Sequence, residues 1–119
     1  MDPKSVLEMY TEAVLNEHAL DRLDEFTTSD NLKKGATGFV SAFPDLRVEL
    51  EFTVCEGLIV GCHAVGSGTH TGASIRGVEP TGRGWSARCN AFFRIEEGKI
   101  TQAWTMWDWA SILSQLRGE

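Results

Sequence analysis

Residues 85–107 read WSARCNAFFRIEEGKITQAWTMW, and this stretch decides the fold class. It holds two runs of strand length, about 85–95 and 99–107, separated only by Glu96-Glu97-Gly98. Two such runs around a short glycine-containing turn predict an antiparallel pair of strands. In the first run every second residue is apolar, which gives one uniformly apolar face made of Ala87, Cys89, Ala91 and Phe93.

The preceding residues extend this sheet by two strands. Residues 46–55, LRVELEFTVC, alternate apolar and polar side chains, which predicts a strand with one buried face. Glu56-Gly57 then turns into a second strand over about 58–70, whose glycines at 61, 66 and 68 permit bends or bulges. Residues 71–84, rich in glycine, are expected to form a loop.

Helical periodicity dominates the N-terminal third of the chain. After the capping pair Asp2-Pro3, apolar residues recur at helical spacing, at Val6, Met9, Tyr10, Ala13 and Val14. A break at 16–19, a short helix over 20–26 and a third helix over about 30–43 follow, and a last helix starts near Trp109. Helices followed by hairpin-linked strands predict a single α+β domain over 1–119, with N-terminal helices on a strongly curved antiparallel sheet, a cone-shaped barrel that encloses a pocket.

Charge and cysteine content narrow the classes of partner. The 119 residues carry a net charge of -6, which argues against binding of nucleic acid or anionic membranes. A small, largely neutral ligand is expected instead. The cysteines, Cys55, Cys62 and Cys89, are odd in number and lack metal-site spacing, which suits reduced thiols in a cytoplasmic protein. No stretch approaches the length of a membrane span.

Asp108 is the candidate catalytic residue. Three of the four tryptophans, at 104, 107 and 109, crowd around it in sequence. Apolar crowding favours the protonated form of a carboxylate, as a general acid/base at neutral pH requires. The alternative is that Asp108 caps the helix that starts at Trp109, which would favour the charged form.

Other candidate site residues follow from strand alternation. Trp104 and Met106 share the parity of Asp108, which would make Trp104 a flat wall for an aromatic ligand or simply a core residue. Asn90 and Phe92 share one strand face with Arg88 and Arg94, a face expected to line a pocket or a dimer interface. Tyr10, on the apolar stripe of the first helix, could reach into the cavity.

The histidines give two further candidates. His70, at a strand end beside two threonines, could bond a substrate carbonyl or hold Asp108, or it could satisfy local backbone groups. His63 must face away from its neighbour Cys62, so only one of the two can point into the pocket. A nucleophilic pair of Cys62 and His63 is disfavoured for the same reason.

Short motifs along the chain resemble those of the SnoaL-like polyketide cyclases. They are Phe43-Pro44-Asp45-Leu46, Gly68-Thr69-His70-Thr71-Gly72, Pro80-Thr81-Gly82-Arg83, Gly98-Lys99-Ile100, Trp104 four residues before Asp108, and Gln115-Leu116. The resemblance implies the cone-shaped barrel of the nuclear transport factor two superfamily, usually a homodimer packed through its outer sheet. It also implies that Asp108 serves as acid/base of an intramolecular aldol ring closure, without metal or organic cofactor.

One position departs from the pattern, because His63 stands where related sequences often carry arginine. The leading hypothesis is a cyclase or isomerase acting on a hydrophobic, ketone-bearing substrate. Asp108 would move the proton and His70 would assist it, in a cavity shaped by Tyr10, Phe92, Trp104 and Met106. Epoxide hydrolysis or double-bond hydration is an alternative that normally needs two carboxylates. A non-catalytic small-molecule binder or dimerisation module of the same fold is the other.

Overall fold

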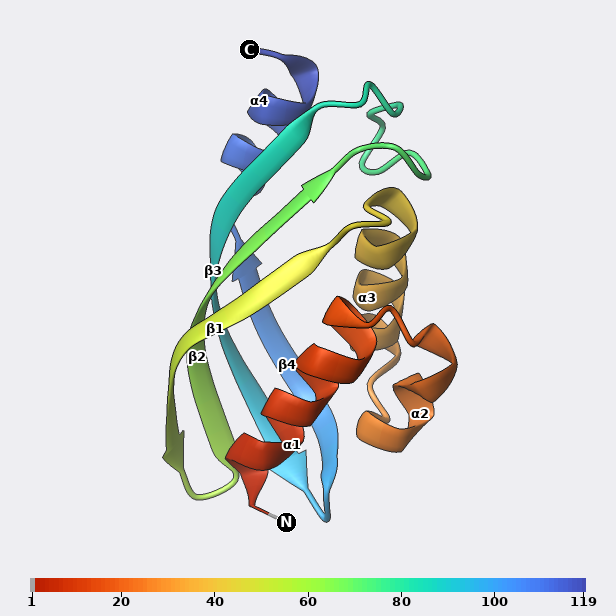
Figure 1. Ribbon diagram of the computed structural model, residues 1–119. Coiled ribbons are helices and arrows are strands. Elements are labelled where there is room, and N and C mark those ends of the chain that lie inside the picture. Colours follow the sequence, from red (N-terminus) through yellow and green to blue (C-terminus); the bar gives the residue numbers. More distant parts are fainter. Residues whose placement is uncertain (1) are drawn as a thin grey trace.

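The computed structural model describes residues 2–119, in which one sheet of four antiparallel strands curls around the first helix (Figure 1). The strands, in their spatial order, are β1 Arg47–Glu56, β2 Ile59–Thr69, β3 Gly84–Glu96 and β4 Lys99–Trp107. The helices are α1 Pro3–Tyr10, α2 Leu23–Phe26, α3 Asp30–Ala42 and α4 Trp109–Arg117. A π-helical segment, η1 Thr11–Asn16, continues α1, and a 3-10 turn, η2 Leu20–Arg22, precedes α2. The predicted α+β fold is confirmed.

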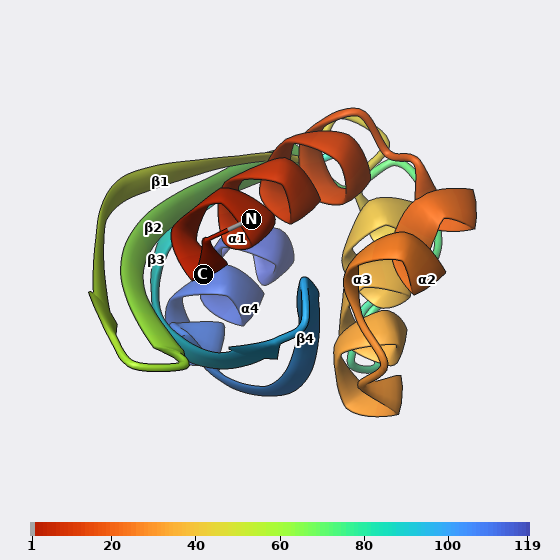
Figure 2. The same ribbon diagram turned by 90° about the horizontal axis from the view of Figure 1, so that it is seen from below.

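The sheet has a concave face, which α1 covers, and a convex outer face (Figure 2). α2 and α3 lie beside β4, while α4 lies across the far end of the sheet. Close packing in the concavity depends on Gly66, because a Cβ there would lie 2.6 Å from the ring of Trp107. The strand glycine therefore makes room for an aromatic ring on the inner face.

The first helix forms where the sequence predicts it, and its cap is visible. The carboxylate of Asp2 accepts a hydrogen bond of 3.0 Å from the Ser5 amide, and Pro3 occupies the first turn. Leu7 and Tyr10 are buried against the sheet, each contributing roughly 1.5–3 kcal/mol to stability. Met9, expected on the apolar stripe, is 44% exposed instead, because it lies at the edge of the buried arc.

A β-bulge in β1 changes which side chains face inward. Leu50 pairs with Ala64 but Phe52 pairs with His63, so Glu51 is an extra residue in the strand. Leu50 therefore faces the concavity, whereas Phe52 faces the convex side and is 62% exposed. The regular alternation of 46–55 predicted a single buried face throughout, and this is wrong beyond Leu50 because a bulge reverses the facing of every later residue.

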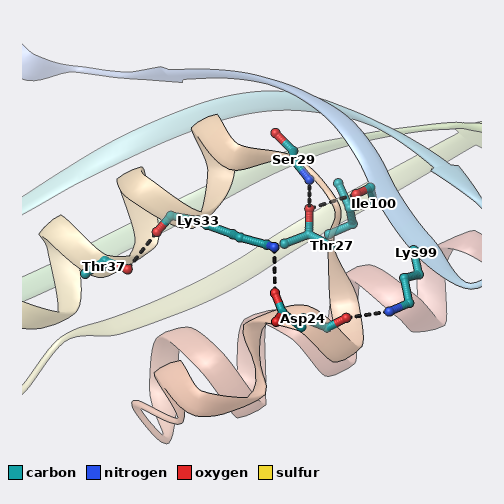
Figure 3. Close-up of polar contacts among 7 residues, drawn as sticks. All are labelled: Asp24, Thr27, Ser29, Lys33, Thr37, Lys99 and Ile100. Atoms are coloured by element: carbon teal, nitrogen blue, oxygen red, sulfur yellow. Dashed lines mark hydrogen bonds and ion pairs between the residues drawn. The ribbon is translucent and has the colours of Figure 1, made fainter.

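Polar contacts attach the segment between α2 and α3 to the start of β4 (Figure 3). The buried Thr27 hydroxyl donates to the Ile100 carbonyl at 2.7 Å and accepts from the Ser29 amide at 2.9 Å. Asp24 pairs with Lys33 at 2.5 Å, and its carbonyl accepts a hydrogen bond from the Lys99 ammonium group. These contacts fix α3 alongside β4.

No helix within residues 2–119 combines the length and the apolar character that a bilayer crossing demands.

Candidate functional site

The concave face of the sheet holds a cavity of about 200 Å³ between the strands, α1, η1 and α3. An engineered cavity of roughly 150 Å³ can hold a benzene molecule, so this space suits a ligand of about one to two rings. Its walls are mostly apolar. They consist of Leu7, Tyr10, Thr11, Leu15, Asn31, Leu32, Gly35, Ala36, Phe39, Leu46, Val48, Leu50, Cys62, Ala64, Arg76, Cys89, Ala91, Phe93, Ala103, Thr105, Trp107 and Trp109.

Small side chains on the central strands create the space. Cys62 and Ala64 of β2 face Cys89 and Ala91 of β3 across the sheet floor, and Ala103 of β4 continues it. Larger residues enclose the cavity from the sides, so the hollow lies where side chains are short.

Three predicted wall residues lie on the opposite face of the sheet. Phe92, Trp104 and Met106 point outward and are 55%, 46% and 75% exposed. The facing of Trp104 and Met106 was predicted from the parity of Asp108, and that of Phe92 from the face it shares with Asn90. The odd-numbered residues of β3 and β4 line the cavity instead. The expectation that these three side chains shape the cavity is therefore wrong, since both faces of these strands carry large apolar groups and periodicity alone could not choose between them.

Of the neighbours Cys62 and His63, only one can point into the cavity, and the sheet register shows which one does. Cys62 lines the cavity and His63 lies on the outer face, where its Nδ1 lies 2.5 Å from Oδ1 of Asn90. The other ring nitrogen lies 3.2 Å from Glu51 and 3.0 Å from Arg88, and the ring stacks on Phe52. His63 and Asn90 thus belong to an outer polar cluster rather than to the cavity.

Asp108 takes the capping geometry. Its Oδ1 accepts a hydrogen bond of 3.1 Å from the Ser111 amide at the start of α4, and the residue is exposed. Trp107 and Trp109, on either side of it, both line the cavity, but the Asp108 side chain does not. The expected enclosure of this carboxylate by tryptophan is wrong, because Asp108 follows β4 as the cap of α4 and its side chain is exposed instead of lying between the two rings.

His70 is fully buried outside the cavity lining. Its Nε2 lies 2.8 Å from the Ala73 carbonyl, so Nε2 carries the proton and donates, and the ring packs edge-on against Phe43. Nδ1 is buried without a hydrogen-bond partner among the described residues. The alternative role, satisfying local backbone groups, is the one that this geometry fits.

The motifs that carry the family resemblance hold the segment 70–83 in place. Asp45 accepts hydrogen bonds from the amide and hydroxyl of Thr69, at 2.7 and 2.8 Å. The amides of Gly72 and Ala73 donate to the carbonyls at the end of α3, at 3.0 and 2.9 Å. A side chain at Gly72 would collide with the Ser41 carbonyl, so this approach requires glycine.

Tyr10 lies in the cavity lining and is only 2% exposed. Burial raises the pKa of its hydroxyl, so it stays neutral and can donate a hydrogen bond. Burial also raises the pKa of Cys62 to about 11 and that of Cys89 to about 12. Both cavity thiols are therefore protonated near neutral pH and are poor nucleophiles.

Sequence reasoning missed several lining residues, above all Arg76, which is the one charged side chain among them. It lies in the segment that the sequence predicts only as a loop. A signal was present, because Arg76-Gly77 lies between Ile75 and Val78, a two-residue turn flanked by β-branched residues. Within residues 2–119, no three histidine, cysteine or acidic side chains are grouped as metal ligands would be.

The curved sheet wrapped around an N-terminal helix is the nuclear transport factor two-like α+β fold. The chain belongs to the SnoaL-like polyketide cyclase family, whose model matches residues 2–116. No curated protein sequence matches the chain.

Solved structures share the fold at low sequence identity. IdmH of Streptomyces antibioticus, a candidate polyketide cyclase, is 24% identical with a TM-score of 0.79, covering 98% of this chain and 99% of that chain. A SnoaL-like polyketide cyclase of Agrobacterium tumefaciens is 20% identical with a TM-score of 0.78, and the match covers 98% of each chain. AclR of Streptomyces galilaeus, a candidate hydroxylase, is 22% identical with a TM-score of 0.81, covering 98% and 82%. Proteins of this fold thus carry different descriptions of their chemistry.

Proposed function

We propose that this chain takes up a small, hydrophobic or aromatic, ketone-bearing molecule in the concave cavity. The enclosed, mostly apolar hollow of about 200 Å³ carries this proposal. Such a cavity with a few convergent polar groups is the usual form of a small-molecule site. The Tyr10 hydroxyl supplies a neutral donor that can bond a ketone oxygen inside it.

Cavity filling tests this proposal. Ala103→Phe places a ring in the cavity, whereas Gln102→Phe places the same ring on the outer face of the same strand. We expect Ala103→Phe to weaken binding of para-ethylacetophenone, followed by tryptophan fluorescence, roughly tenfold or more, and Gln102→Phe to leave it unchanged. Equal binding by Ala103→Phe and the unmodified chain would show that this cavity is not the binding site.

A second candidate function is cofactor-independent ring closure, which the family match over residues 2–116 favours. In an intramolecular aldol reaction a base removes a proton from carbon beside one ketone. The resulting carbanion bonds to a second carbonyl carbon, and the new alkoxide takes up a proton. No carboxylate or histidine is among the cavity-lining residues, so a base must come from the rim.

Asp108 is the candidate base in that reaction, because it lies between two lining residues, Trp107 and Trp109. To act there, its carboxylate must leave the Ser111 amide and turn toward the cavity. Asp108→Asn retains a capping oxygen but cannot take up the proton. Unchanged ring closure by Asp108→Asn would eliminate this role; it is measured on a diketone whose cyclic hydroxyketone product is separated from the open form by chromatography. Hydration or epoxide hydrolysis is less favoured, because the lining offers no pair of carboxylates around a water.

We also propose that the convex face joins two copies of the chain. Large apolar side chains are exposed together on it, namely Phe52, Val54, Phe92, Trp104 and Met106. In the sheet register Phe92 pairs with Trp104 and lies opposite Gly61, which in turn pairs with Val54, so these groups form a continuous band. The same face carries both charge signs, at Glu51 and Arg88. A surface with both signs can complement itself across a two-fold axis.

A further inference from the structure

Arg76 lies at the mouth of the cavity and is the one cation in its lining. The other lining residues at the mouth that are exposed are Asn31, Gly35 and Thr105, none of which is charged. The chain as a whole carries a net charge of -6, so its general field repels anions. Among the lining side chains, Arg76 is therefore the one that offers positive charge to an anionic ligand.

The guanidinium group is held in place by an aromatic ring of the same cavity. Its central carbon lies 3.8 Å from the ring centroid of Trp109, a cation–π arrangement. Within residues 2–119 no carboxylate forms an ion pair with Arg76. A stacked guanidinium still presents its edge N–H groups, which match the two oxygens of a carboxylate. Trp109 thus orients the Arg76 guanidinium group, whose edge N–H groups remain available as hydrogen-bond donors.

The backbone at Arg76 adopts a conformation that favours glycine. Its φ is +47°, followed by +79° at Gly77, in a two-residue turn closed by hydrogen bonds of 3.1 and 2.9 Å between Ile75 and Val78. An arginine in the left-handed region is strained, and such strain persists only where the surroundings hold it. The amides of Gly72 and Ala73 bond the same segment to the end of α3, and the His70 ring bonds the Ala73 carbonyl within the segment.

We propose that Arg76 makes this cavity selective for hydrophobic carboxylic acids, whose apolar, ketone-bearing body lies inside while the carboxylate meets the guanidinium at the mouth. This inference rests on the proposed uptake of a small molecule by the cavity and names its substrate class. Free acids are favoured over their neutral esters and amides, because only the carboxylate gains the two charge-assisted hydrogen bonds.

A matched pair of probes tests the selectivity. para-Ethylbenzoate and para-ethylbenzamide have the same apolar body and differ in charge. Tryptophan fluorescence titrations near neutral pH compare the unmodified chain, Arg76→Gln and the control Arg47→Gln. Arg47 is an exposed residue of β1 outside the lining, so its replacement removes the same charge elsewhere. We expect the unmodified chain and Arg47→Gln to prefer the benzoate roughly tenfold, and Arg76→Gln to bind both probes about equally.

The outcomes separate the two proposals. Equal binding of both probes by the unmodified chain, or a benzoate preference that survives in Arg76→Gln, overturns the role of Arg76 while leaving the cavity as a binding site. Failure of both probes to bind overturns uptake by the cavity and the selectivity together. Should Arg76→Gln fold poorly, salt gives a second readout on the unmodified chain. The benzoate preference must shrink as ionic strength rises, and a constant preference contradicts the ion pair.

Discussion

Both faces of the sheet carry apolar side chains, but the side chains differ in length and in what covers them. The concave face combines short side chains, such as Ala91 and Ala103, with a covering helix, which leaves a hollow. The convex face carries long ones, such as Trp104 and Met106, with nothing over them. Apolar content alone therefore does not tell which face is a site, because side-chain length and helical cover decide it.

Two adjacent phenylalanines of β3 give the sharpest comparison of stability. Phe93 is buried on the concave side and Phe92 is 55% exposed on the convex side. We expect Phe93→Ala to lower the free energy of unfolding by about 3–5 kcal/mol, through lost burial and an enlarged cavity. Phe92→Ala is expected to cost under about 1 kcal/mol at concentrations where the chain is monomeric. Urea unfolding measures both, and equal losses would contradict the assignment of faces.

Cysteine reactivity compares the cavity with the exposed end of β1. The pKa values of Cys62 and Cys89, raised by burial to about 11 and about 12, leave both thiols protonated at neutral pH. Cys55 is exposed. We expect one thiol per chain to react with a disulfide reagent at least about a hundredfold faster than the other two.

Raising the pH should speed the slow thiols, because the thiolate fraction grows as the pH approaches each raised pKa. Cys55→Ser identifies the fast site. A fast phase that persists in Cys55→Ser would place a reactive thiol in the cavity after all.

The proposed contact between two copies of the chain through the convex face can be tested by a substitution in its exposed apolar band. Met106→Glu puts a carboxylate into the exposed apolar band, where a contact between copies would bury it. We expect the dimer to be weakened by roughly 2 kcal/mol, which raises its dissociation constant about thirtyfold, because an unpaired buried charge is costly. Sedimentation across a concentration series measures this. Thr37→Glu, on the exposed side of α3, is the charge-matched control, and a shift of the same size there would exclude a specific interface.

The smallest effect is expected at the junction of β4 and α4. Asp108→Ala removes the oxygen that accepts from the Ser111 amide, which should lower the free energy of unfolding by about 1 kcal/mol. Asp108→Asn retains an acceptor and should be nearly neutral. Thermal unfolding compares the two variants. If Asp108→Asn destabilises as much as Asp108→Ala, the carboxylate has a role in the fold beyond capping.

Strand positions were predictable from the sequence, but strand facing was only partly so. The runs 85–95 and 99–107 lie within one residue of β3 and β4, because turn chemistry and strand length are local properties. Facing depends on which side α1 covers, a long-range property that the apolar residues on both sides of β4 leave open. The bulge at Glu51 left no break in the apolar alternation and could not have been read from it.

The candidate site was predicted less well than the fold. Tyr10 lines the cavity, and the sequence could indicate this because helical periodicity places Tyr10 on the buried stripe of α1. The enclosure of Asp108 was inferred from three tryptophans that lie near it in sequence, whereas successive residues of an extended chain point to opposite sides. Arg76 was missed because a loop has no periodicity, and its approach to Trp109 joins residues far apart along the chain.

The extra residue at Glu51 couples two surfaces that lie on opposite sides of the sheet. If Glu51 instead paired regularly with His63, the ladder would be plain, and Phe52 and Val54 would turn from the outer face to the inner face. The cavity would then lose space for a ligand, and the exposed apolar band of the convex face would lose two of its members. Loss of this one bulge would therefore weaken uptake of small molecules and self-association together, in one evolutionary step.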